Sequence, residues 1–143
     1  MAKKLPPGPV KEFVDTVRSY FMEGISSEKL WPLVAKDLKS LLSDNSLINQ
    51  SKVWPDTKMG NAPPSNLLFY EDPDYGFVLN ALVKAPKSIT NIHDHGPSWT
   101  LYGVLDGGEQ IKRFRRLDKN QKENGPAVIE PSGDFEVVPG YID

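Results

Sequence analysis

The chain has 143 residues, of which 38% are hydrophobic and 25% are charged, a size and composition typical of one domain with its own core. Its formal net charge of −2 gives no electrostatic basis for binding nucleic acid or an anionic membrane surface, and no apolar run approaches the roughly 18 residues of a membrane span. The chain contains no cysteine, which excludes disulfides, cysteine-ligated zinc and a cysteine nucleophile.

Residues 1–9 are rich in proline and are expected to form a flexible lead-in. They carry two lysines but no apolar segment of the kind found in a signal peptide. A cytoplasmic location is therefore expected, in keeping with the absence of cysteine.

Residues 10–45 are predicted to be a helical segment. Apolar residues recur at helical spacing over residues 10–22, and this first helix is expected to end near Gly24. Ser26 or Ser27 can cap a second amphipathic helix that ends around residues 44–45. Two such helices need a partner that covers their apolar faces.

The period of the apolar residues changes from helical to alternating after a loop-like stretch. Residues 46–66 are predicted to be a linker loop, because "NAPPSN" at its end suits neither a helix nor a central strand. Residues 67–143 are then predicted to be a β domain in which many short strands favour a barrel or sandwich. Its expected strands are 67–72, 77–85, 99–105, a partner across the "DGG" turn at 109–118, and two short strands within 128–140.

The only two histidines of the chain are His93 and His95, separated by Asp94. In a strand, residues two apart point to the same face, so both imidazoles would meet at one spot while Asp94 points away. Two neutral imidazoles suit a borderline metal ion such as iron(II), manganese, nickel, copper or zinc. The alternative is a pair of histidines in a polar loop, because this spacing alone is a weak signal.

The stretch "IHDHGPSWTLYGVLDGGEQIKRF" resembles the first motif of the cupin superfamily, whose fold is a double-stranded β-helix barrel. His93 and His95 match the two histidines of that motif, Gly107 matches its glycine, and Thr100 stands at its glutamate position. Within the superfamily the stretch is most similar to the cysteine-dioxygenase-type branch. The resemblance implies a mainly β fold: a cupin barrel preceded by two helices.

The resemblance also implies a function. It points to a non-haem iron(II) dioxygenase-like oxidoreductase that acts on a small organic substrate, with a thiol or a carboxylate as candidates. His93 and His95 would be metal ligands, and manganese, nickel or zinc could replace iron. The family's third histidine belongs to a second motif, which would lie beyond Asp143, so the β domain is expected to be truncated at its C-terminus and the barrel incomplete. Glu109, Glu136 and Asp143 are carboxylate candidates for a third ligand.

Several further residues are candidates for the substrate site. Tyr102 could donate a proton to a bound ligand. Thr100, Trp99 and one of the two arginines Arg113 and Arg115 could contact substrate, although Trp99 is favoured as a core residue. The basic run "KRFRR" at 112–116 is interpreted as a solvated strand rather than a nucleic-acid site.

Two other functions stay open. The chain could be a non-catalytic cupin that binds a small ligand or a partner through a degenerate metal site, since a third histidine is missing and Arg18 is the only arginine before the histidine pair. It could also use zinc or manganese without oxygen chemistry. A homodimer is possible through the sheet edge that an incomplete barrel would leave open.

Overall fold

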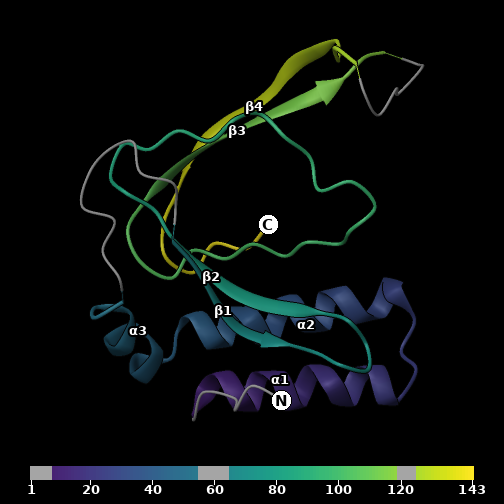
Figure 1. Ribbon diagram of the computed structural model, residues 1–143, viewed down its shortest axis with the longest axis vertical. Helices are drawn as coiled ribbons and strands as arrows, with labels where there is room; N and C mark the ends of the chain where they lie inside the picture. Colours follow the sequence, from purple (N-terminus) through teal and green to yellow (C-terminus); the bar gives the residue numbers. More distant parts are fainter. Residues whose placement is uncertain (1–7, 55–64, 119–124) are drawn as a thin grey trace.

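The computed structural model describes residues 8–54, 65–118 and 125–143, which form three helices followed by two β-hairpins (Figure 1). The helices are α1 (Pro9–Met22), α2 (Ser27–Leu42) and α3 (Asn45–Ser51), and the strands are β1 (Ser65–Glu71), β2 (Val78–Val83), β3 (Glu109–Arg116) and β4 (Ile129–Val137). Among these residues, no helix combines the length and apolar character needed to cross a membrane.

The predicted mainly β cupin barrel is wrong, because the described strands form two separate two-stranded antiparallel sheets in a mixed α/β fold. A barrel requires a closed ring of paired strands. Residues 99–105, expected to pair with residues 109–118, form no strand and contribute only the isolated bridge between Gly103 and Ile142. β3 pairs instead with β4, in a register that places Glu109 opposite Val137. The two short strands expected within 128–140 are the single strand β4.

The two predicted long helices are confirmed as α1 and α2. Gly24, with a φ of 65°, follows the end of α1, and its N–H bonds back to the carbonyl of Phe21. The third helix begins at Asn45, the last residue of the predicted helical segment, and otherwise lies in the range 46–66 predicted as a linker loop. Asp44 caps it by accepting a 2.9 Å hydrogen bond from the backbone N–H of Leu47, which is buried.

The main core lies between the helices and the inner face of the β1–β2 hairpin. Its buried residues come from all three helices: Val10, Phe13, Val17, Leu30, Val34, Leu41 and Leu47. Phe69 of β1 and Leu79 of β2 pack against this cluster. The predicted alternation along β2 is confirmed, since Leu79, Ala81 and Val83 are partly buried while Val78 and Leu82 are exposed.

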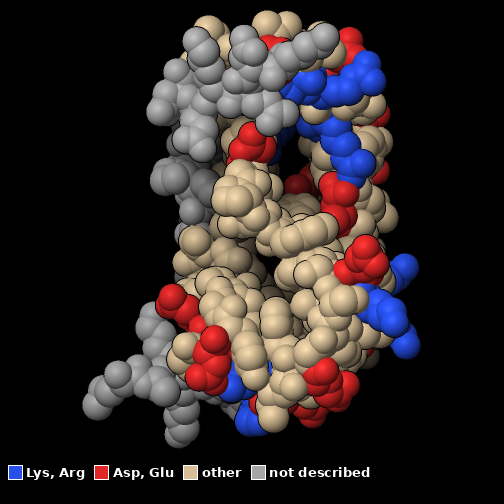
Figure 2. Space-filling view, turned by 90° about the vertical axis from the view of Figure 1, so that its right-hand side faces the viewer, with Lys and Arg blue, Asp and Glu red and all other residues tan. Residues whose placement is uncertain are grey.

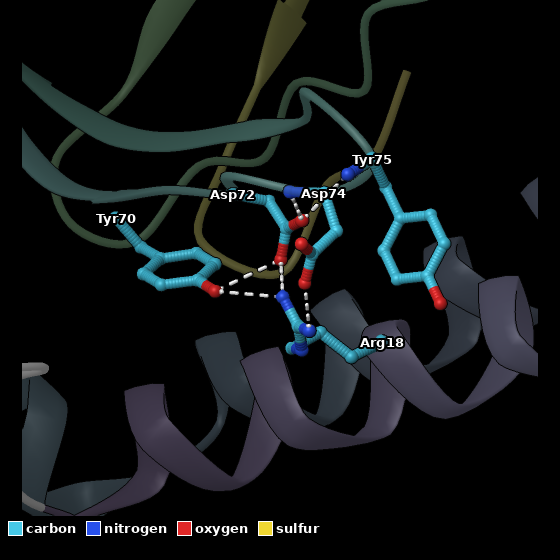
Figure 3. A network of polar contacts seen from close by, with 5 residues as sticks. All are labelled: Arg18, Tyr70, Asp72, Asp74 and Tyr75. Carbon is cyan, nitrogen blue, oxygen red and sulfur yellow. Dashed lines mark hydrogen bonds and ion pairs between the residues drawn. The ribbon is translucent and has the colours of Figure 1, made fainter. Parts of the chain in front are cut away.

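A polar network joins α1 to the turn between β1 and β2 (Figure 3). Asp72 is buried, and its carboxylate pairs with Arg18 and accepts hydrogen bonds from the Tyr70 hydroxyl (2.8 Å) and from the N–H groups of Asp74 (2.9 Å) and Tyr75 (2.7 Å). Arg18 also pairs with Asp74 at 2.6 Å. Burial alone would raise the pKa of Asp72, but these hydrogen bonds outweigh it and hold the pKa below its usual range. This network anchors the helices to the hairpin.

Candidate functional site

His93 and His95 lie in the connection between β2 and β3, which has no regular secondary structure in this region (Figure 1). The strand expected to align them does not form, and every residue from 89 to 100 is exposed. The two imidazoles are nonetheless neighbours, with ring centres 5.4 Å apart and planes at 80°. The structure therefore brings together the two predicted metal ligands, although not by the predicted geometry.

Two tight turns shape the histidine loop. The side chain of Asp94 accepts a 3.0 Å hydrogen bond from the N–H of Gly96, and the N–H of Ser98 donates to the carbonyl of His95 at 3.2 Å. Gly96 has a φ of 58°, a left-handed conformation that glycine adopts without a steric penalty. Local turn chemistry thus replaces a strand ladder in placing the two rings close together.

The hydrogen bond of His93 determines which of its ring nitrogens can bind a metal. Its Nδ1 lies 2.7 Å from the backbone oxygen of Asn91. Because a carbonyl oxygen only accepts, Nδ1 must carry the proton of this bond, and the Nε2 of the neutral ring then carries the lone pair. Metal-binding histidines commonly have their second nitrogen oriented in this way.

The three carboxylates that are candidates for a third metal ligand lie beside other residues. Glu109 bonds Tyr102 and Lys84, Asp143 pairs with Arg113, and the exposed Glu136 stands opposite Gln110 in the β3–β4 ladder. Within residues 8–54, 65–118 and 125–143, no group of three or more His, Asp or Glu side chains is placed to hold one metal ion. Of the candidate ligands, the structure brings together only the two imidazoles in the part of the chain that it describes.

Tyr102, the candidate proton donor, belongs to a half-buried cluster with Glu109 and Lys84. Its hydroxyl donates to Glu109, and the ammonium of Lys84 lies 3.2 Å from both carboxylate oxygens and 3.3 Å from the Tyr102 hydroxyl. Burial, reinforced by the bond to Glu109, raises the pKa of Tyr102 well above its usual value of 10.0. The phenol stays protonated and its proton is held by Glu109. Lys84 was missed by sequence reasoning, because its partner Glu109 lies 25 residues away.

We expect Tyr102→Phe to lower the free energy of unfolding by about 1 kcal/mol, because it removes the hydrogen bond to a partly buried carboxylate. The difference in unfolding free energy between Tyr102→Phe and the unmodified protein should become smaller at alkaline pH. A group whose pKa is raised by folding contributes stability below its unfolded pKa, near 10, and loses that contribution as the pH rises further. Urea unfolding of both proteins at pH 7 and pH 10.5 measures this. A constant difference would contradict the assignment of the raised pKa.

The candidate substrate arginines both have carboxylate partners. Arg113 pairs with Asp143 and Arg115 pairs with Glu130. Their neighbours follow the same rule, since Lys112 lies 3.9 Å from Asp134 and Arg116 binds Asp118 through two nitrogens. Figure 2 shows a group of basic side chains at the upper right of this face, with acidic side chains beside it, and further basic side chains lower down. This pairing favours the solvated-strand interpretation of "KRFRR" over an anion site.

Trp99 is not a core residue, since 71% of its surface is exposed. Its ring stacks on Trp31 of α2, with centres 5.6 Å apart and planes at 19°. The two indoles border a shallow groove of about 390 Å³ whose lining is mainly apolar and includes Pro32 and Leu101. Thr100 beside it is exposed, whereas Tyr102 is half-buried.

Comparison with known proteins found no family model, no curated protein and no solved structure that matches this chain.

Proposed function

We propose that this chain binds a divalent metal, preferentially iron(II), through His93 and His95, and that it acts as a non-haem dioxygenase-like oxidoreductase on a small organic substrate. The observation that carries the proposal is the pair of exposed imidazoles whose ring centres lie 5.4 Å apart. Two imidazoles bound to one ion through metal–nitrogen bonds of about 2.0–2.1 Å have ring centres roughly 5 Å apart.

The donor set fits the proposed ion. Neutral imidazole nitrogens suit iron(II), and they equally suit manganese, nickel and zinc. The backbone oxygen of Asn91 orients the His93 ring for this role, and the side chain of Asp94 is directed to the N–H of Gly96. Iron is preferred because the residues around the pair resemble an iron-dependent branch.

In the proposed reaction, the metal ion, the two histidines and the turns that hold them would have separate roles. Bound iron(II) would supply the oxygen chemistry. His93 and His95 would hold the ion at the exposed loop, where both substrate and dioxygen have access. The turns at Asp94–Gly96 and His95–Ser98 would keep the two rings together before the ion binds, which lowers the cost of ordering them.

An oxygen electrode tests the proposed chemistry. Protein loaded with iron(II) without air should consume dioxygen when a small thiol or carboxylate substrate is added, and His95→Ala should abolish this consumption. Asp94→Asn is the matched control, because it keeps the side-chain oxygen that accepts from Gly96 and should retain activity. Iron-loaded protein that consumes no dioxygen with any thiol or carboxylate tested would contradict the oxidoreductase proposal.

A second candidate, a non-catalytic ligand-binding module, is favoured by the groove between Trp31 and Trp99. The indole Nε1 of Trp31 is buried and has no hydrogen-bond partner among the described residues, an arrangement that typically costs about 1–3 kcal/mol. Tryptophan fluorescence that changes with an aromatic carboxylate in the presence of EDTA, and not in Trp99→Ala, would support this function.

A further inference from the structure

The proposed metal site leaves most of the ion's coordination positions unfilled. Metal ions of this class take four to six ligands, and His93 and His95 supply two. The described part of the chain assembles no third His, Asp or Glu side chain with them. Beyond these described residues, solvent, substrate or another molecule can supply the remaining ligands.

The histidine loop is accessible to a second molecule. All residues from 89 to 100 are exposed, so no element among the described residues buries the two rings. The only formally charged side chain in this stretch is Asp94, which is held by Gly96 and lies within electrostatic reach of Arg116 of the same chain. Two copies of the loop can therefore approach each other with little charge repulsion.

The same stretch also exposes large apolar side chains. Ile89 is 95% exposed, Ile92 is 61% exposed and Trp99 is 71% exposed. The face toward which the β2–β3 connection extends in Figure 1 is mostly uncharged across its middle, as Figure 2 shows. An exposed apolar surface with few charged side chains at its centre is typical of protein–protein interfaces.

We propose that a second copy of this chain completes the site, so that one metal ion is bound by His93 and His95 of both copies. This inference rests on the proposed metal-binding function. Four imidazoles satisfy a tetrahedral ion and leave two positions of an octahedral ion for other ligands. The exposed apolar residues around the pair would be covered between the two loops, which favours association.

Sedimentation velocity with cobalt(II) tests the inference on the full chain, because cobalt(II) accepts the same donors and is stable in air. We expect the 16.0 kDa monomer to double in mass at one ion per two chains, and to return to the monomer with EDTA. A large excess of ion should also separate the dimer, since each copy can then bind an ion of its own. Asp94→Asn should dimerise like the unmodified chain, and the double variant His93→Ala/His95→Ala should stay monomeric.

The possible outcomes distinguish the shared metal site from the proposed metal-binding function on which it rests. One ion bound per chain with no change in mass would overturn the shared site and leave the metal-binding proposal intact. No ion bound at all would overturn both. A dimer that forms without metal and persists in EDTA would overturn the bridging role of the histidines.

Discussion

Replacing either His93 or His95 by alanine is expected to weaken the binding of iron(II) or cobalt(II) by more than about 100-fold. Each substitution removes one of the two donors that the exposed loop brings together, and a single remaining imidazole binds these ions weakly in competition with water. Calorimetric titration of the two variants and the unmodified protein under nitrogen measures the loss.

The controls for this prediction lie in the same loop. Asp94→Asn keeps the turn at Gly96 and should bind metal like the unmodified chain. Far-ultraviolet circular dichroism should be the same for all four proteins, because the loop contributes no helix or strand. Metal affinity that is unchanged in both histidine variants would contradict the site.

Removing the carboxylate of Asp72 is expected to lower the free energy of unfolding by about 3 kcal/mol. In Asp72→Ala the partly buried Arg18 loses one of its two ion-pair partners, and the N–H groups of Asp74 and Tyr75 lose their acceptor. Asp74→Ala is the matched control. Its carboxylate binds the same arginine but is 61% exposed, so its removal should cost at most about 1 kcal/mol.

The contribution of Asp72 should also depend on pH in a defined direction. Folding lowers its pKa below the ordinary value of 3.8, so the stabilisation is fully present above that value and is lost as the pH falls through the folded-state pKa. Urea unfolding between pH 7 and pH 2 should show the difference between Asp72→Ala and the unmodified protein shrinking only in acid. Equal losses in Asp72→Ala and Asp74→Ala at pH 7 would contradict the role of the network.

The two long helices α1 and α2 and the first hairpin could be predicted because their information is local. The apolar spacing of α1 and α2 and the alternation of β2 follow from the neighbours of each residue along the chain. Local patterns could not show whether the strands form a barrel, because the pairing of strands depends on segments that are distant in the sequence. The "DGG" turn predicted that residues 99–105 would pair with β3, whereas β4 (Ile129–Val137) takes that place.

The site shows the same division between local and distant information. The residue types and spacing of His93 and His95 predicted a pair of neighbouring imidazoles, and the turns at Gly96 and Ser98 produce that pair without a strand. The contacts of Arg18 with Asp72 and of Lys84 with Glu109 could not be predicted, because 54 and 25 residues separate the partners. Arg18 was considered only as a distant arginine, and its ion pairs instead anchor α1.

The most direct test of metal binding by His93 and His95 is the X-ray absorption spectrum of the iron-loaded protein at the iron edge. Imidazole rings bound to iron produce a multiple-scattering contribution that water and carboxylate ligands lack. We predict this contribution in the unmodified protein and its disappearance in His93→Ala/His95→Ala. Iron surrounded by oxygen ligands alone in the unmodified protein would contradict the account.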